Sequence, residues 1–424
     1  MTPDLHNPEL GPWLKGWPLQ APPCLRSEVA GRGWRVLGGG LPLPLAVLHR
    51  GRLARNLGWM QTLAERAGVS LAPHGKTTMA PALFQAQLAA GAWGITFASV
   101  SQLAIGVASG VRRALIANQV LQAADLHALA ALQRAHPDLR APFLVDSPAQ
   151  LAAIEHAQAG AVFEVLVELG LPGGRTGVRD DAEALALARR LRASPAVRLV
   201  GVEAYEGLWA TGDDDTDRQL VDAVLGRLDA FLRTAQAQAL FETDRPLVSA
   251  GGSAVFDLVA AGLGTLASQG QRLALLRSGC YVTHDDGAYQ RYASVVNRRL
   301  GCAEAAGLQA ALQVWCLVQS CPEPGLAVLN AGKRDVSTDW GLPVPVAWAP
   351  AGAESPLACP PGWTVEKLND QHAYLRVADG STAPRVGDRL ALGISHPCTT
   401  FDKWRWMPVV DETLAVVDAI VTWF

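Results

Sequence analysis

Lysine is scarce in this chain, and charge of one sign never dominates it. Of 36 basic residues, five are lysine, namely Lys15, Lys76, Lys333, Lys367 and Lys403, and the net charge is −3 over 424 residues. Such a balance gives no electrostatic reason to bind nucleic acid or an anionic membrane. No uninterrupted apolar run reaches the about 18 residues of a membrane span, and the N-terminus lacks the pattern of a signal peptide. We expect neither a membrane nor nucleic acid as a partner.

Cysteines are few, scattered and odd in number: seven, with no CxxC pair. This pattern argues against a disulfide framework and favours free thiols in a reducing compartment, so we expect a cytoplasmic protein. The length and the 50% hydrophobic content suffice for two domains, or for one large domain with an addition.

Between about residues 43 and 280, β-rich runs alternate with Ala- and Leu-rich runs of helical period. About eight alternations predict a parallel sheet with helical crossovers, and this number over roughly 240 residues fits a (β/α)8 TIM-type barrel, of class α/β. A doubly wound open sheet is the alternative. The strand-like runs are Pro44–Leu48, Val69–Pro73, Trp93–Ala98, Arg113–Asn118, Ala141–Asp146, Val162–Leu169, Arg198–Tyr205, Pro246–Ser249 and Arg272–Arg277.

The composition changes after about residue 300, where Pro, Gly and Trp become common. Runs such as Leu312–Gln319 alternate as antiparallel strands do. We expect a C-terminal antiparallel β domain. The Pro-rich stretch Trp340–Trp363 is expected to be an exposed loop or excursion. Three parts are thus predicted: an N-terminal segment that packs on the β domain (1–42), a barrel (43–305) and the β domain (306–424).

Lys76 stands where a strand-like stretch ends and a helix-like stretch begins. Barrel enzymes keep their chemistry at the C-terminal ends of strands. An amine in a dry pocket loses its proton more readily and can attack an aldehyde, so Lys76 is a candidate Schiff-base former. His74 would share its face if both lie on one strand. The alternatives are a surface lysine in a turn and a histidine satisfied by backbone hydrogen bonds.

Two glycine-rich loops follow other strand-like runs. Ser249–Ser253 (SAGGS) precedes a helix-like run, and unobstructed N–H groups at a helix N-terminus bind phosphate, although an ordinary turn would look similar. Glu168–Val178 carries Arg175, whose guanidinium either meets an anionic or phenolic oxygen or lies at the surface of a turn.

His396 and Cys398 lie two residues apart in the β-rich part of the chain. On an extended chain their side chains share a face, and imidazole plus thiolate is a zinc-type pair. Two ligands do not fill a tetrahedral site, so the site would stay open to substrate and water, as a catalytic metal requires. A bare His-x-Cys pair also arises by accident.

An amine, a phosphate cradle, an anion or phenol partner and a metal pair together suit a pyridoxal phosphate enzyme with a metal. From about residue 43 to its end, the chain resembles the fold-type III pyridoxal phosphate enzymes related to D-serine dehydratase and D-threonine aldolase. The resemblance rests on six motifs in the order of that family: Pro73–Thr77, Ala117–Val120, Arg175–Val178, Ala204–Gly207, Ser249–Ser253 and His396–Cys398.

The resemblance implies an alanine-racemase-like barrel and a homodimer with its active site near the subunit interface. It implies that Lys76 binds pyridoxal 5'-phosphate as a Schiff base, beside His74. Tyr205 is expected near the pyridine nitrogen and Arg175 near the phenolic oxygen. The residues expected around the phosphate are Ser249, Gly251, Gly252 and Ser253.

His396 and Cys398 match the metal pair of that family, so a divalent metal is expected, zinc first, with manganese or magnesium as alternatives. The aldolase branch typically has His-x-Asp there, so the cysteine resembles the dehydratase branch. Asp370–His372 stands where many members have Asp-Glu-His. Gln371 cannot act as a base, whereas His372 remains a candidate catalytic acid or base.

The reaction expected from the resemblance is elimination of water from a D-β-hydroxy amino acid such as D-serine or a D-threonine-like substrate, giving a 2-oxo acid and ammonia. The alternative is retro-aldol cleavage to glycine and an aldehyde at the same site. A racemase is a third possibility and a pyridoxal phosphate carrier or regulator a fourth, but carriers of that kind lack the C-terminal β domain.

Overall fold

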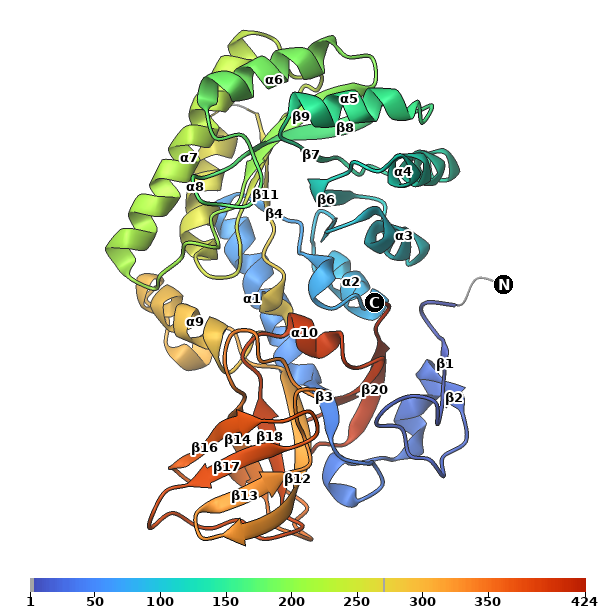
Figure 1. Cartoon of the computed structure of the whole chain (residues 1–424), viewed down its shortest axis with the longest axis vertical. Coiled ribbons are helices and arrows are strands. Elements are labelled where there is room, and N and C mark those ends of the chain that lie inside the picture. The colour runs from blue at the N-terminus through green and yellow to red at the C-terminus, as the bar shows by residue number, and fades with distance from the viewer. Residues whose placement is uncertain (1–3, 270) are drawn as a thin grey trace. The chain divides into compact units, whose positions relative to one another are not determined.

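Two units make up this computed structural model, which describes residues 4–269 and 271–424 (Figure 1). The barrel unit consists of residues 60–76 and 84–279, residue 270 apart, and the β unit of residues 4–59, 77–83 and 280–424. The predicted division into three parts, with boundaries at residues 42 and 305, rests on changes in composition and periodicity along the sequence, and we keep it as a proposal.

A parallel sheet of eight strands frames the barrel unit. The sheet closes because the Trp93 N–H donates to the Leu71 carbonyl at 2.7 Å and the Thr96 N–H to the Pro73 carbonyl at 2.8 Å. This closure confirms the predicted (β/α)8 barrel. In order around the sheet, the strands are β4 (Ser70–Leu71), β11 (Leu273–Leu276), β10 (Leu247–Ala250), β9 (Val197–Ala204), β8 (Phe163–Leu169), β7 (Phe143–Val145), β6 (Ala114–Gln119) and β5 (Ile95–Phe97).

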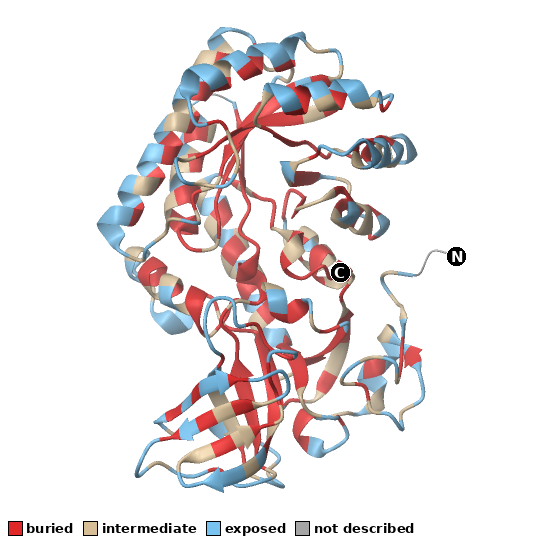
Figure 2. Cartoon of the chain, viewed as in Figure 1, coloured by how far each residue is buried: buried red, intermediate tan, exposed pale blue. Residues whose placement is uncertain are grey.

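Helices follow these strands and lie on the outside of the sheet, with their exposed faces outward (Figures 1 and 2). Asp180 and Asp213 start two of them by accepting backbone N–H groups of the first turn, which satisfies donors that a helix N-terminus leaves free. The helices are α3 (Val100–Ala108), α4 (Ala123–Ala135), α5 (Pro148–Ala157), α6 (Asp181–Ala193), α7 (Asp214–Ala237) and α8 (Phe256–Ser268), while α1 (Arg50–Ala67) and α2 (Pro81–Ala89) each have residues in both units.

The barrel interior is filled by apolar side chains, as a packed core rather than a channel. Nearly every strand contributes an inward residue to one buried cluster. This cluster contains Ala72, Trp93, Leu115, Leu144, Leu166, Val200, Leu247, Leu273 and Leu275.

The β unit is built on an antiparallel sheet, as predicted, with one parallel pairing between β3 and β19. Helices α9 (Ala288–Arg299) and α10 (Cys398–Phe401) accompany it. Its strands are β15 (Leu357–Ala358), β14 (Val344–Ala349), β18 (Arg389–Gly393), β12 (Leu312–Glu323), β13 (Leu326–Leu329), β17 (Ala373–Val377) and β16 (Trp363–Leu368), joined by β3 (Leu45–His49), β19 (Trp406–Val410) and β20 (Val416–Val421).

Two of the sequence predictions were wrong. The run Pro44–Leu48 forms β3, which pairs with β12 and β19 of the β unit and not with a barrel strand. The stretch Trp340–Trp363 is not simply a loop, because it contains β14 and β15. Its Pro345 is accommodated where the register between β14 and β18 shifts, since a proline cannot donate to a regular ladder.

The N-terminal residues contribute to the core of the β unit. Trp17 is buried, and its ring lies edge-on to those of Trp34 and Trp406, each with its centroid 5.0 Å away. A short ribbon of β1 (Glu9–Leu10) and β2 (Cys24–Leu25) precedes Trp34. In the part of the chain that the structure describes, no helix combines the length and apolar character of a membrane span.

Leu166 in the centre of β8 tests the barrel core. Because its side chain is 0% exposed, Leu166→Ala removes buried methylene groups and leaves a cavity, so we expect the free energy of unfolding to fall by about 2–5 kcal/mol. Leu121, 54% exposed, is the matched control, and Leu121→Ala should change it by less than about 0.5 kcal/mol. Urea unfolding measures both, and equal losses would contradict the assignment of the core.

Candidate functional site

Lys76 lies in a short 3-10 turn (Gly75–Thr77) at the C-terminal end of β4. The preceding His74 forms a parallel bridge to Thr96, which fixes the end of the strand. Gly75 admits no side chain, because a Cβ there would lie 2.8 Å from Cγ2 of Ile95. The bridge of His74 and the close packing of Gly75 therefore set the position of Lys76.

The charges of three cations act on His74. Burial lowers the pKa of His74 well below its ordinary value, and the charges of Lys76, Arg277 and Arg175 lower it further. His74 is therefore neutral at physiological pH. The Nδ1 atom of His74 is buried and has no hydrogen-bond partner among the described residues. It is therefore left to bind a ligand.

Arg175 and Tyr205 come from the loops after β8 and β9 and meet at this end of the barrel. The Arg175 guanidinium lies over the Tyr205 ring at 4.7 Å from its centroid. Tyr205 also lies against the glycine turn after β10, since a Cβ on Gly252 would come 3.2 Å from the Tyr205 hydroxyl. The structure thus brings three of the predicted cofactor residues together.

The glycine turn after β10 already binds an anion. The backbone N–H groups of Gly251 and Gly252 both donate to the Glu206 carboxylate, at 3.0 and 2.8 Å. Gly251 has a φ of +104°, which residues with a side chain rarely adopt. Two convergent amides with no Cβ in the way form the kind of cradle that also holds phosphate.

A buried ion pair supports this end of the barrel. Arg277, at the end of β11, contacts Glu203 at 2.7 Å and donates to the Ser249 hydroxyl at 2.6 Å and to the Ala204 carbonyl at 3.0 Å. Burial raises the pKa of Glu203 to about 7, while the charge of Arg277 opposes that rise. Arg277 therefore joins β9, β10 and β11 at the ends from which Tyr205 and the glycine turn depart.

These residues fit pyridoxal phosphate. They offer an amine for its aldehyde, an amide cradle for its phosphate, and a phenol and a guanidinium for its ring atoms. The unpartnered Nδ1 of His74 and the carboxylate seated on the Gly251 and Gly252 amides are the observations that support the fit. Ser249 directs its hydroxyl to Leu275 and Arg277, so its part in phosphate binding remains a prediction, as does that of half-buried Ser253.

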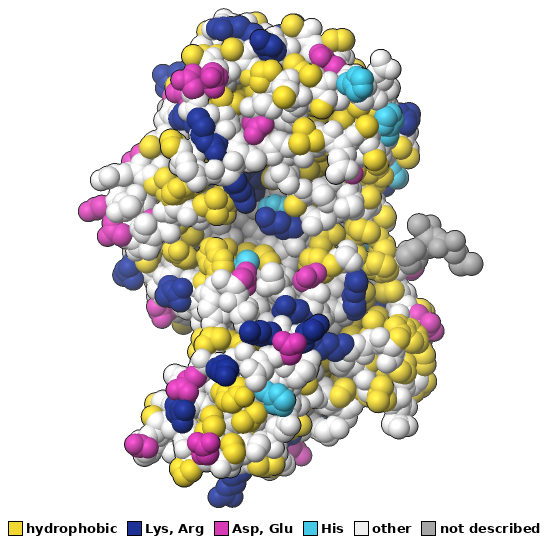
Figure 3. Space-filling model, viewed as in Figure 1, with side chains coloured by type: hydrophobic (Ala, Val, Ile, Leu, Met, Phe, Trp, Pro, Cys, Tyr) yellow, Lys and Arg dark blue, Asp and Glu magenta, His cyan; other side chains and the backbone are white. Residues whose placement is uncertain are grey.

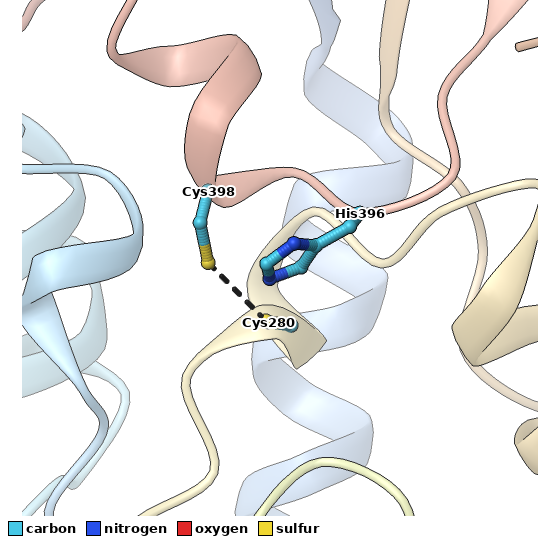
Figure 4. A group of neighbouring side chains, drawn as sticks. All are labelled: Cys280, His396 and Cys398. Atoms are coloured by element: carbon cyan, nitrogen blue, oxygen red, sulfur yellow. Dashed lines mark hydrogen bonds between the residues drawn. The ribbon is translucent and has the colours of Figure 1, made fainter. Parts of the chain in front are cut away.

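A second group of residues lies in the β unit. The side chains of His396 and Cys398 converge with that of Cys280, and their donor atoms all lie within 4.8 Å of one another (Figure 4). The Sγ atoms of Cys280 and Cys398 are 3.8 Å apart. Two thiols and an imidazole are donors that zinc prefers, so this group fits the implied metal.

The imidazole of His396 is held on both sides. Its Nδ1 atom is 2.5 Å from Oδ2 of Asp339, and its ring lies 5.4 Å from that of Trp340. Burial lowers the pKa of His396, but the hydrogen bonds and charges of Cys280 and Asp339 raise it to about 9. His396 has a φ of +151°, and the Ser337 hydroxyl donates to its carbonyl at 2.6 Å, so a constrained backbone presents the ring.

His372, the other predicted catalytic residue, precedes β17 and is half-buried. Among the contacts that the structure describes, none joins its side chain to the metal-binding group, so its role remains a prediction. Asp370 and Gln371 instead line an open pocket of about 620 Å³ with four basic residues, Lys15, Lys333, Arg334 and Lys403. On the face of the molecule that Figure 3 shows, positive and negative side chains are interspersed.

The sequence analysis missed Cys280, Arg277, Glu206 and Asp339. Arg277 and Cys280 could have been found, because they stand at and just beyond the end of the predicted strand 272–277, where barrels keep their functional residues. Asp339 and His396 are 57 residues apart, and nothing in their local sequence indicates that they meet.

Two family models match this chain, one mostly in the barrel unit and the other in the β unit. Residues 48–270 match the alanine racemase N-terminal domain, and residues 311–410 match a serine dehydratase domain. A D-threonine aldolase of Arthrobacter sp. is 31% identical over 87% of this chain and 89% of its own, and a D-threo-3-hydroxyaspartate dehydratase of Delftia sp. (strain HT23) is 28% identical over 90% and 97%. The crystal structure of the D-threonine aldolase from Filomicrobium marinum superposes with a TM-score of 0.75, at 25% identity, over 92% of this chain and 96% of that one.

The fold and the sites thus define a barrel enzyme of the alanine racemase type. More narrowly, the chain belongs to the D-serine dehydratase and D-threonine aldolase family of fold-type III enzymes.

The buried pair of Arg277 and Glu203 generates a stability prediction. Arg277→Met leaves Glu203 buried without its cation, so we expect a loss of about 3–5 kcal/mol in the free energy of unfolding at pH 8. Without Arg277 the pKa of Glu203 rises further, so the loss should shrink toward pH 5, where Glu203 is protonated in the folded state. Urea unfolding at both pH values measures this.

The matched control is the double variant Arg277→Met with Glu203→Gln. It removes both charges and should lose less stability at pH 8 than Arg277→Met alone. A double variant that loses the sum of the two single effects would show that the two side chains are not coupled.

Proposed function

We propose that this protein is a pyridoxal phosphate- and metal-dependent lyase that eliminates water from D-configured β-hydroxy amino acids, giving a 2-oxo acid and ammonia. The observation that carries the proposal is the convergence of His396 and Cys398 with a further thiol, because a racemase has no need of a metal. Two relatives support the substrate class, since they are named for D-threonine and D-threo-3-hydroxyaspartate.

In the barrel unit, the proposed site residues bind and orient the cofactor. Bound pyridoxal phosphate supplies an electron sink that makes the α-proton of an amino acid removable. Lys76 would hold the cofactor through its Nζ atom, and Nζ would also take the α-proton. The amides of Gly251 and Gly252, which donate to Glu206 in this structure, would hold the phosphate, and neutral His74 adds no charge to the nearby cations.

Tyr205 and Arg175 set the electronic character of the site. Tyr205 would offer the pyridine nitrogen a phenol in place of a carboxylate, so that nitrogen would stay unprotonated and the electron sink would be weaker. Arg175, whose guanidinium lies over the Tyr205 ring, would donate to the phenolic oxygen. A weak sink needs further electrophilic help at the β-carbon.

In the β unit, the residues hold a metal. A divalent metal there supplies Lewis acidity that makes the β-hydroxyl a better leaving group. Thiol and imidazole donors favour zinc over manganese or magnesium, so we propose zinc. Thr77 lies beside this group, with its hydroxyl oxygen 3.5 Å from the Cys398 sulfur.

Retro-aldol cleavage to glycine and an aldehyde is the second candidate. The 31% identical D-threonine aldolase favours it. Both reactions use the same Lys76 and metal, and they differ in whether the proton leaves the α-carbon or the β-hydroxyl. The Cys398 ligand, in place of the aspartate of the aldolase branch, favours dehydration.

The proposal extends to a cytoplasmic homodimer. None of the seven cysteines forms a disulfide in this structure, which supports a reducing compartment. The family resemblance supports a dimer whose active site lies near the subunit interface, and His372 remains the candidate acid or base.

Product analysis with and without a chelator tests the reaction. We expect the zinc-loaded protein to release ammonia and 2-oxo acid from D-serine or D-threonine, EDTA to abolish this, and added zinc to restore it, because the β-hydroxyl leaves poorly without a Lewis acid. Aldehyde in place of ammonia would establish the aldolase alternative. Racemised substrate with unchanged turnover in EDTA would contradict both.

The role of Lys76 is tested by Lys76→Ala. We expect 2-oxo acid formation to fall by at least about a thousandfold, because one amine both holds the cofactor and moves the proton. Lys367→Ala is the matched control, since Lys367 is exposed on β16, and it should keep the wild-type rate. Product formed at the wild-type rate by Lys76→Ala would refute the mechanism.

A further inference from the structure

Cys280 is a buried thiol beside the metal pair His396 and Cys398, and it is not one of the two metal ligands predicted from the sequence. It begins the short 3-10 turn Cys280–Val282, more than 110 residues before His396 and Cys398 in the chain, and its Sγ atom lies 3.8 Å from that of Cys398. Figure 4 shows Cys280 beneath the imidazole ring, facing the sulfur of Cys398. A structural thiol would need only an apolar pocket, whereas this one meets two other metal-type donors.

We propose that Cys280 is a third metal ligand, so that zinc is held by two thiolates and one imidazole with a single open position. This inference rests on the proposed function, which requires a metal here, and it defines the ligand set and hence the choice of metal.

The distance between the two sulfurs fits this ligand set. Two sulfurs bound to zinc at about 2.3 Å, with a tetrahedral angle between them, lie about 3.8 Å apart. The observed separation of Cys280 and Cys398 is 3.8 Å. A disulfide would bring them to about 2.05 Å, so the pair is spaced for a shared ion and not bonded.

The imidazole is oriented to complete the set. Asp339 accepts at Nδ1 of His396, which leaves Nε2 for the metal, the arrangement that orients histidine ligands and makes them more basic. The second oxygen of Asp339 accepts from the Thr399 hydroxyl at 3.1 Å, so the carboxylate is itself fixed. The ring of Tyr289 lies 5.9 Å from that of His396 and restricts its tilt.

The two thiols share one further polar neighbour. The hydroxyl of Thr77 lies 3.5 Å from Sγ of Cys398 and 4.0 Å from Sγ of Cys280, and Thr77 is buried. This hydroxyl can donate its one proton to either sulfur once that sulfur is a thiolate, which stabilises the negative charge in a buried place.

A third protein ligand changes what the metal can do. Two thiolates neutralise the charge of a divalent zinc, and soft sulfur donors disfavour magnesium and manganese. Three protein ligands leave one position of a tetrahedron, as in catalytic zinc sites. The β-oxygen of the substrate would therefore replace a single bound water, in a direction opposite the three ligands.

X-ray absorption at the zinc edge of the wild-type holoenzyme tests the ligand set directly. We expect two sulfurs at about 2.3 Å and one nitrogen at about 2.0–2.1 Å from the protein. Cys280→Ser should show one sulfur and bind zinc at least about 100-fold more weakly in competition with a chelator, because loss even of an outer-shell partner costs 10–100-fold. Cys321→Ser, which removes an exposed thiol on β12, is the control and should change neither value.

One sulfur at the zinc of the wild type would overturn the inference, and so would a Cys280→Ser variant with unchanged zinc affinity. The wild-type spectrum decides the question even if Cys280→Ser fails to fold. Two sulfurs with no turnover of D-β-hydroxy amino acids would keep the ligand set and reject the proposed function. One sulfur with EDTA-sensitive turnover would reject the ligand set and keep the proposed function. A wild type that binds no zinc would reject both the ligand set and the proposed function.

Discussion

The closure of the parallel sheet between β4 and β5 is the constraint on which the barrel site depends. It rests on short backbone hydrogen bonds, such as that from Trp93 to Leu71 at 2.7 Å. Once the sheet is closed, the carboxyl ends of its strands form a ring, and residues from the two halves of the unit are brought face to face. His74 and Lys76 at the end of β4 then share one electrostatic environment with Arg175, which lies about a hundred residues later in the chain.

The charges in this ring have to be balanced, because they are largely removed from water. Arg277 is paired with Glu203 and also donates to a hydroxyl and a carbonyl, so its guanidinium is well satisfied. Glu206 gives its carboxylate to two backbone amides instead. A phosphate arriving at Gly251 and Gly252 would meet amides that already bind an anion, and Glu206 would then have to share or release them.

The architecture could largely be predicted from the sequence, because strand and helix periodicity is local. The glycine and lysine motifs at strand ends identified residues that the structure brings to one end of the barrel, and their roles remain predictions. Pairing between distant segments was not readable. Pro44–Leu48 has the composition of any buried strand, and its composition does not say whether it pairs with β4 or with β12. The prolines of 340–363 suggested a loop, but a bulge lets β14 keep its place in the sheet. Cys280 could have been found from its place just beyond the predicted strand 272–277, but nothing local shows that it meets His396 and Cys398, more than a hundred residues later.

The discontinuity of the β unit has a consequence for the order in which the chain can fold. β3 pairs with β12, and Leu48 and Leu312 in this pairing are more than 260 residues apart, with the whole barrel sheet encoded between them. A ribosome adding about 5–20 residues per second delivers β12 on the order of 10–50 s after β3. During synthesis, the eight barrel strands are therefore complete before β3 has any partner. All five residues of β3 are buried in the finished protein, so this strand spends that interval with an apolar surface and open hydrogen-bonding edges.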